Sequence, residues 1–272
     1  MYRVIKALNN NGILALDEKN RETILLGKGI GFAKKTGERI DKPASAKVYL
    51  LLKGNGKAEH ALTTVNDIDP KAVEMAARLL DLAKNRFPAV RDDILLPMAD
   101  HLQMAFRRKK TGARLPNPLQ HDIMAMFPEE YAVARDGLVA LATDPDMALP
   151  EEEAAYLSLH IHAGISETKA GESLQTLELA SRLIEKIEAK AQLSFVRASL
   201  KYTRLVSHVC YMIQRVKAQE KVSVDLSAYI EASYPKAWKI AVEISAILST
   251  ELSLPVEKNE IGLLALHIQR VL

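Results

Sequence analysis

Hydrophobic and polar positions follow two different patterns along the chain. In residues 1–57, short apolar stretches alternate with turns rich in Gly, Asn and Asp, a pattern typical of β-strands. The pair Asn11-Gly12 predicts a hairpin with a type I′ turn, in which both central residues take positive φ. A β domain this small is marginally stable and would gain from dimerising. The predicted strands cover residues 2–8, 13–16, 23–26, 30–33 and 47–52.

From about residue 66 onward, apolar residues recur every three or four positions, which predicts amphipathic helices almost to the end of the chain. Prolines such as Pro88 and Pro116 fall between these segments, where a helix can end or begin. We therefore expect a multidomain protein with a small all-β N-terminal domain and an all-α remainder.

The helical region repeats itself without a gap at an offset of 107 residues. His101 falls on His208, and His160 falls on His267. The segment 127–131 falls on 234–238, and both begin with an aromatic residue followed by proline. This predicts two tandem helical-bundle domains, 66–171 (the first copy) and 172–272 (the second copy), after a linker at 58–65.

Composition restricts the class of protein and the cellular compartment that we expect. The chain has 272 residues, 48% of them hydrophobic and 26% charged, as in an ordinary globular protein. Its single cysteine, Cys210, excludes an intrachain disulfide framework and fits a reducing compartment. The chain has no apolar run of membrane-spanning length and no signal-peptide pattern, so we expect a cytoplasmic protein without membrane insertion.

The charge is divided unevenly between the two regions. Residues 1–57 carry 12 Lys and Arg against 5 Asp and Glu, a net charge of +7, and the rest of the chain carries −4. A basic N-terminal piece favours an anionic partner, and nucleic acid is the first candidate. The alternative is a lysine-rich surface that serves solubility alone.

The repeated histidines are the main candidates for chemistry. A lone histidine after an apolar run is usually a satisfied core residue, but paired placement in both copies favours a function. A metal site would need further shared ligands; Asp100 precedes His101, whereas Ser207 precedes His208. Imidazole is largely unprotonated near neutral pH and can accept a phosphoryl group. We expect surface or local polar roles for the histidines without a counterpart, His60, His121 and His162.

Several segments resemble those of the BglG/LicT/SacY family of transcriptional antiterminators. The most specific are residues 6–13 and 26–37; residues 117–119, 127–131, 159–161 and 266–271 resemble the regulatory part of the family. The resemblance implies a non-enzymatic regulator of sugar utilisation, with an RNA-binding co-antiterminator domain followed by two regulation domains of the sugar phosphotransferase system (PTS). It implies no catalytic residues, no metal and no cofactor.

The resemblance also implies a mechanism. A homodimer of the β domain grips a hairpin in mRNA, the ribonucleic antiterminator, and so prevents an overlapping terminator from folding. Phosphorylation of the first copy by the sugar-specific PTS permease (enzyme II) inactivates the protein. Phosphorylation of the second copy by the phosphocarrier HPr favours dimerisation and activates it. The phosphorylation positions carried over are His101, His160, His208 and His267.

Six positions match the RNA-contact pattern of the family. Lysines would neutralise phosphates, glycines would let the backbone approach the RNA, and an aromatic ring would stack on an unpaired base. The family often has arginine where Lys28 stands, which puts a bidentate contact there in doubt. The alternative is that Phe32 fills the small β core and the glycines only form a turn. The positions are Lys6, Asn11, Gly27, Lys28, Gly29 and Phe32.

Two other classes of protein fit the sequence less well. An all-α metal-dependent phosphohydrolase would use a pair such as His121-Asp122, but the repeat places Ala228-Tyr229 at the equivalent positions. A DNA-binding transcriptional regulator with the same regulation domains would ordinarily carry a helix-turn-helix ahead of them, whereas this N-terminal region is predicted to be β.

Overall fold

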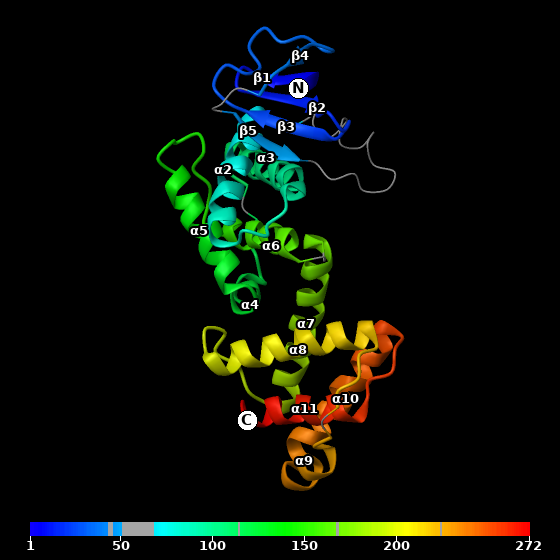
Figure 1. Ribbon diagram of the computed structural model, residues 1–272. Coiled ribbons are helices and arrows are strands. Elements are labelled where there is room, and N and C mark those ends of the chain that lie inside the picture. The colour runs from blue at the N-terminus through cyan, green and yellow to red at the C-terminus, as the bar shows by residue number, and fades with distance from the viewer. Residues whose placement is uncertain (43–45, 51–67, 114, 167–168, 224) are drawn as a thin grey trace. The chain divides into compact units, whose positions relative to one another are not determined.

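The computed structural model describes residues 1–42, 46–50, 68–113, 115–166, 169–223 and 225–272. The predicted linker, 58–65, lies outside these residues. The chain forms two compact units (Figure 1). The first unit contains residues 1–116 and 129–169, and the second contains residues 117–128 and 170–272. Residues 117–128 therefore belong by packing to the second unit, although they lie within the first copy of the repeat.

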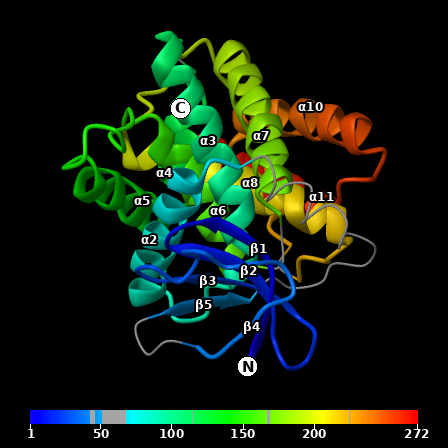
Figure 2. The same cartoon turned by 90° about the horizontal axis from the view of Figure 1, so that it is seen from above.

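A five-stranded antiparallel sheet forms the N-terminal part of the first unit, in the order β4-β1-β2-β3-β5. Figure 2 looks onto this sheet and shows β1, β2, β3 and β5 following one another. One face packs an apolar core that includes Val4, Ile13 and Leu25. The strands are β1 (Tyr2–Asn9), β2 (Gly12–Leu16), β3 (Glu22–Leu26), β4 (Arg39–Ile40) and β5 (Lys47–Leu50).

The all-β character of this region is confirmed, but one predicted strand is wrong. Residues 30–33 form consecutive turns, in which the amides of Ile30, Phe32 and Lys34 donate to the carbonyls three residues before them. Gly29 and Ala33 have φ of +73° and +56°, which an extended strand does not allow. The short strand β4 lies beyond this segment and was not predicted.

The type I′ turn is also wrong in detail. The β1–β2 hairpin turns at Asn10 and Asn11, and Gly12 already pairs with Leu26 in the sheet. None of Asn10, Asn11 and Gly12 has a positive φ. The side chain of Asn9 stabilises the turn instead, because its Oδ1 accepts a hydrogen bond from the amide of Asn11 at 2.7 Å.

The rest of the first unit is helical, as predicted. Helices α2 and α3 pack side by side, and α5 approaches α2 closely at Gly137, where a Cβ atom would lie 2.4 Å from Leu79. The sheet contacts this bundle through β5, since Tyr49 Oη donates to Asp81 at 3.1 Å and the Leu50 amide donates to Asp92 at 3.0 Å. The elements are α2 (Pro70–Arg86), the 3₁₀ turn η1 (Asp92–Ile94), α3 (Leu95–Thr111), α5 (Pro128–Leu141) and α6 (Glu153–Ile165).

All regular secondary structure described in the second unit is helical. Helix α9 packs on α10 and α11. Its repeat equivalent, α4, packs instead on α7 and α8. No described helix of the chain is both long and apolar enough to cross a membrane. The helices are α4 (Gln120–Met126), α7 (Ala170–Ala191), α8 (Leu200–Ala218), α9 (Ser227–Ser233), α10 (Pro235–Leu252) and α11 (Lys258–Gln269).

Candidate RNA-binding surface and histidine pairs

Five of the six predicted RNA-contact residues gather beside the β1–β2 turn. Asn11 connects the β1–β2 turn to residues 27–29. Its carbonyl accepts a hydrogen bond from the Gly27 amide at 2.8 Å, and its Oδ1 accepts one from the Gly29 amide at 2.9 Å. Lys28 lies between these glycines and is exposed. Lys6 lies apart from this turn, on β1 opposite Leu14.

Phe32 lies on the turn that follows Gly29, and its side chain is 68% exposed. Its amide donates to the Gly29 carbonyl at 3.1 Å, which ties the aromatic residue to the glycine turn. Gly31 is packed so tightly that a Cβ atom would lie 1.9 Å from the Asn9 carbonyl oxygen. The alternative in which Phe32 fills the β core is therefore wrong, because this side chain lies in solvent.

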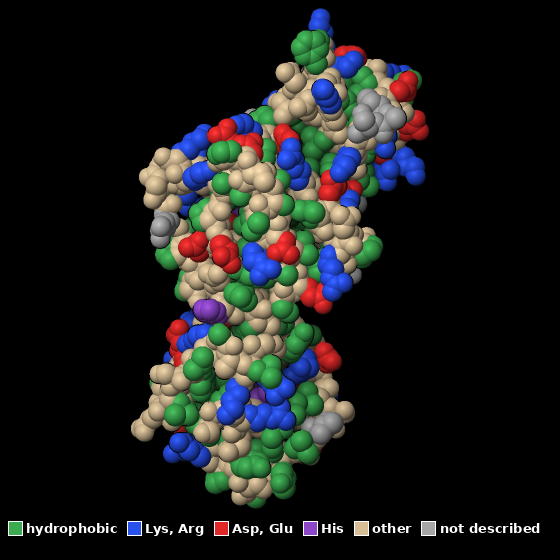
Figure 3. Space-filling view, turned by 90° about the vertical axis from the view of Figure 1, so that its left-hand side faces the viewer, with side chains coloured by type: hydrophobic (Ala, Val, Ile, Leu, Met, Phe, Trp, Pro, Cys, Tyr) green, Lys and Arg blue, Asp and Glu red, His purple; other side chains and the backbone are tan. Residues whose placement is uncertain are grey.

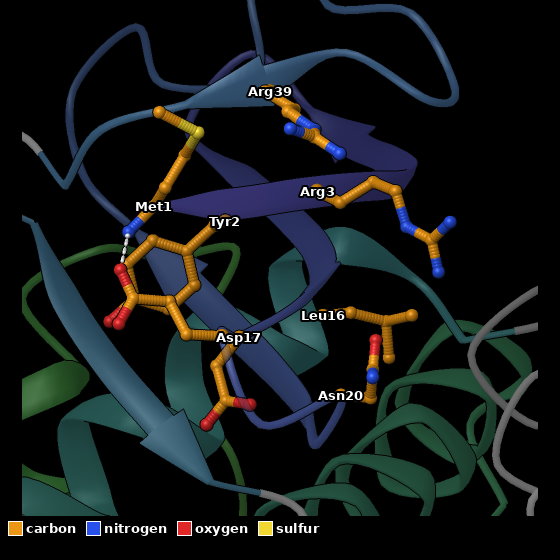
Figure 4. Close-up of a pocket in the computed structure, with 8 residues that line it drawn as sticks. Met1, Tyr2, Arg3, Leu16, Asp17, Asn20 and Arg39 are labelled. Carbon is orange, nitrogen blue, oxygen red and sulfur yellow. Dashed lines mark hydrogen bonds and ion pairs between the residues drawn. The ribbon is translucent and has the colours of Figure 1, made fainter.

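A shallow pocket occupies the opposite end of the hairpin (Figure 4). There the N-terminal amine of Met1 pairs with Glu18 at 2.7 Å. Arg3 on β1 and Arg39 on β4 are directly paired in the sheet, and both are exposed. Neither arginine forms an ion pair with a described residue. This pocket was not predicted, and it does not include the predicted RNA-contact residues.

The structure brings together the two histidines of the first copy. The rings of His101 on α3 and His160 on α6 have centroids 5.6 Å apart and planes inclined by 51°. His101 Nε2 lies 2.8 Å from an oxygen of Glu153, and Arg108 donates to the other oxygen at 2.7 Å. Burial, followed by neighbouring His101, lowers the pKa of His160 to about 4, so this imidazole is neutral near pH 7.

The histidines of the second copy are closer. The rings of His208 on α8 and His267 on α11 are stacked, with centroids 4.1 Å apart and planes inclined by 14°. Burial, then His267 and Arg215, lowers the pKa of His208 to about 3. Burial, then Arg270 and Arg204, also lowers the pKa of His267. Burial therefore favours the neutral form of both imidazoles.

The two pairs have different polar surroundings. In the second copy Glu260 binds Arg215 through two hydrogen bonds of 2.5 and 2.8 Å. The buried Nε2 of His208 has no hydrogen-bond partner among the described residues. In the first copy, the equivalent carboxylate of Glu153 is shared between His101 and Arg108. The two Arg–Glu ion pairs were not predicted from the sequence, although the offset of 107 relates Arg108 to Arg215 and Glu153 to Glu260.

Of the histidines without a repeat partner, His60 lies outside the described residues, and the structure describes His121 and His162. His162 Nδ1 lies 3.0 Å from Glu130, and His121 is exposed. Asp122, beside His121, is buried and accepts a hydrogen bond from Tyr202. In the described part of the chain, no group of three or more His, Cys, Asp or Glu side chains is arranged to hold a metal ion. Cys210 is free and buried, and burial raises the pKa of its thiol to about 12.

Two family models match separate parts of the chain. Residues 2–57 match the CAT RNA binding domain. The PRD domain matches twice, over residues 74–164 and 181–271, and these matches are displaced by 107 residues. Together the two PRD matches cover more than half of the chain.

Relatives match over nearly their whole length. The chain is 24% identical to the transcription antiterminator LicT of Bacillus subtilis, and the match covers 99% of this chain and 98% of LicT. It is 29% identical to the PtsGHI operon antiterminator of the same organism, with 99% and 97% covered. It is 25% identical to a beta-glucoside operon antiterminator of Dickeya chrysanthemi, with 99% and 96% covered.

A solved structure supports the fold of the N-terminal portion. The crystal structure of GlcT CAT-PRDI has a TM-score of 0.52 and 29% sequence identity, and covers 61% of this chain and 98% of the solved one. A CAT RNA binding domain followed by two PRD domains is thus found in a chain whose relatives are named as antiterminators. The chain belongs to the BglG/LicT type of transcription antiterminators.

Proposed function

We propose that the β domain binds a hairpin in nascent mRNA and thereby prevents a terminator from forming. The observation that carries this proposal is the exposed Phe32 ring beside the Gly27–Gly29 turn. An exposed ring can stack on an unpaired base, and the glycines let the RNA backbone come close. Lys28 and Lys6 neutralise phosphates, and Asn11 positions the turn.

Binding of the full-length chain to imperfect RNA hairpins, at several salt concentrations, tests this surface. Phe32→Ala removes the stacking ring and should weaken hairpin binding by about tenfold or more. Lys28→Gln should weaken binding and reduce its salt dependence, whereas Lys19→Gln removes the same charge from the exposed turn at the other end of the hairpin and should change little. Equal binding of the Phe32→Ala variant and the unmodified protein would exclude this surface.

We propose further that His101, His160, His208 and His267 are phosphorylation sites. The phosphoryl donors are PTS proteins: the sugar-specific permease for the first copy, and the phosphocarrier HPr for the second. The two histidine pairs support this proposal, because low pKa values of His160 and His208 keep these imidazoles neutral and nucleophilic. The active form is a cytoplasmic homodimer, and the regulated genes serve sugar utilisation, as the names of the relatives suggest.

Phosphotransfer from HPr and from the permease to the full-length chain, read by mass spectrometry, tests the assignment of donors. His208→Ala and His267→Ala should abolish activation in a transcription-readthrough assay. His101→Ala and His160→Ala should instead relieve inhibition when the inducing sugar is absent. His121→Ala, which changes an exposed histidine without a repeat partner, is the matched control. If all four variants behaved like the unmodified protein, the phosphorylation switch would be excluded.

A further inference from the structure

Two arginines flank the histidine pair of the second copy. Arg204 precedes His208 by four residues on α8, and Arg270 follows His267 by three residues at the end of α11. These spacings place each arginine on the same helix face as its histidine. Both guanidinium groups act electrostatically on His267. In Figure 3, Lys and Arg side chains surround a histidine on the surface of the second unit.

Neither arginine has a counterion within the described part of the protein. The side chains of Arg204 and Arg270 make no ion pair or hydrogen bond there, and both residues are exposed. Arg215, by contrast, is neutralised by Glu260 through two hydrogen bonds. Two uncompensated guanidinium groups beside neutral, stacked imidazoles leave a local excess of positive charge, which an anion would balance.

The first copy lacks this arrangement. The repeat places Pro97 and Ala163 where the second copy has Arg204 and Arg270. In addition, His101 Nε2 contacts the carboxylate of Glu153, whose negative charge opposes an anion at that nitrogen. The two copies thus share the histidines but differ in how they would treat a negatively charged group.

We propose that Arg204, Arg270 and the stacked rings of His208 and His267 form a binding site for a phosphate-class dianion. This inference rests on the proposed phosphorylation and deepens it, because the site would hold the phosphoryl group after transfer. In that step the lone pair of a neutral imidazole nitrogen forms the new N–P bond. The N–P bond of the donor phosphohistidine breaks, and its electron pair returns to the donor ring. Guanidinium groups suit the product, since their N–H fork matches phosphate oxygens.

Binding of inorganic phosphate to the unphosphorylated full-length chain tests the site without phosphotransfer. Histidine NMR signals report it, since the chain has seven histidines and His208 and His267 can be assigned by substitution. Phosphate should shift these two sets of signals, and chloride at equal ionic strength should not. Arg204→Gln and Arg270→Gln should each weaken phosphate binding by about tenfold, which corresponds to about 1.4 kcal/mol and to the loss of one charge-assisted hydrogen bond.

Arg182→Gln is the matched control, because Arg182 is an exposed arginine of the same unit that pairs with Glu251 at 3.4 Å. Its phosphate binding should equal that of the unmodified protein. Unchanged affinity in both Arg204→Gln and Arg270→Gln, or equal weakening in Arg182→Gln, would overturn the inference.

A second measurement separates this inference from the proposed function. After phosphorylation by HPr, the phosphoryl group on the second copy should be lost several-fold faster in Arg204→Gln and Arg270→Gln than in Arg182→Gln. If HPr phosphorylates neither His208 nor His267 while phosphate binding depends on the two arginines, the proposed function fails and the anion site stands. If phosphorylation proceeds and neither arginine affects binding or retention, the anion site fails and the proposed function stands.

Discussion

The hydroxyl of Tyr202 on α8 donates a hydrogen bond to the carboxylate of Asp122 on α4. Both residues are buried, at 1% and 3% exposure. Arg197 donates to the Tyr202 hydroxyl at 2.6 Å and to Glu188 at 2.7 Å, which extends the network toward α7. The repeat does not reproduce this network. The equivalent of Asp122 in the second copy is Tyr229, and the equivalent of Tyr202 in the first copy is Leu95. The network therefore explains why α4 packs on α7 and α8.

Tyr202→Phe tests this attachment. The substitution removes the Tyr202 hydroxyl donor from the buried Asp122 carboxylate, which keeps its hydrogen bond with Ser181, and should lower the free energy of unfolding by about 1–3 kcal/mol. Chemical denaturation followed by circular dichroism measures the change. His121→Ala alters the exposed neighbour of Asp122 and should have little effect. A Tyr202→Phe variant as stable as the unmodified protein would show that the hydrogen bond does not attach α4.

The buried histidines predict a loss of stability in mild acid. Unfolding restores the pKa of His160 from about 4 to its ordinary value of 6.5, so the unfolded chain binds more protons between these two pH values. Stability should therefore fall as the pH falls from about 6.5 to about 4. Denaturation near pH 7.5 and near pH 5 measures the slope, which His160→Gln should reduce and the exposed-site variant His121→Gln should not. A slope unchanged by His160→Gln would contradict the buried neutral state.

Glu153 and Glu260 should respond differently to the same substitution. Glu153→Gln changes the direct partner of His101, so the ring signals of His101 should shift strongly in NMR spectra. Glu260→Gln, the repeat equivalent, changes a residue bound to Arg215 and should leave the His208 signals nearly unchanged. Equal responses of His101 and His208 would mean that the two copies have equivalent histidine environments, contrary to the structure.

Arg3 and Arg39 predict a stabilising substitution. Like charges directly opposite on neighbouring strands destabilise a sheet, and these two residues are paired on β1 and β4. Arg39→Glu should raise the free energy of unfolding by about 0.2–1 kcal/mol, and Arg39→Gln should give a smaller gain. Thermal denaturation at low salt measures both. Because the pair lies at the opposite end of the hairpin from Phe32, RNA hairpin binding should be unaffected; a large loss of RNA binding would instead place RNA at this end.

The sequence predicts repeated and regular features better than irregular ones. Short apolar stretches bounded by turn residues located β1, β2, β3 and β5, and in β2 and β3 four consecutive residues of the stretch are buried. This pattern failed at residues 30–33, where Ile30 and Phe32 look like strand residues but one is buried and the other exposed on consecutive turns. Positive φ at Gly29 and Ala33 is incompatible with an extended strand, and an apolar stretch in the sequence does not report this backbone conformation.

The site shows the same contrast. The offset of 107 located the members of both histidine pairs, because equivalent positions lie close together in each copy, although the rings are tilted in the first and stacked in the second. The same offset relates Glu153 to Glu260 and Arg108 to Arg215, but an isolated Arg or Glu on a helix looks like an ordinary solvated residue. The hydrophobic spacing of the sequence does not indicate that α4 packs outside its own copy. This packing depends on Tyr202 and Arg197, which are far from Asp122 in the sequence.

The placement of α4 makes the two units topologically inseparable by a single cut. The chain passes from the first unit to the second after Pro116, returns after Pro128, and passes over again after Lys169. A fragment that ends near residue 170 would keep α4 but lose the helices on which it packs, and would leave Ile123 and Asp122 uncovered. The chain thus connects the two units at three points, and two of these connections flank the seven-residue helix α4. A rearrangement of the second unit would therefore act on the first unit through three connections.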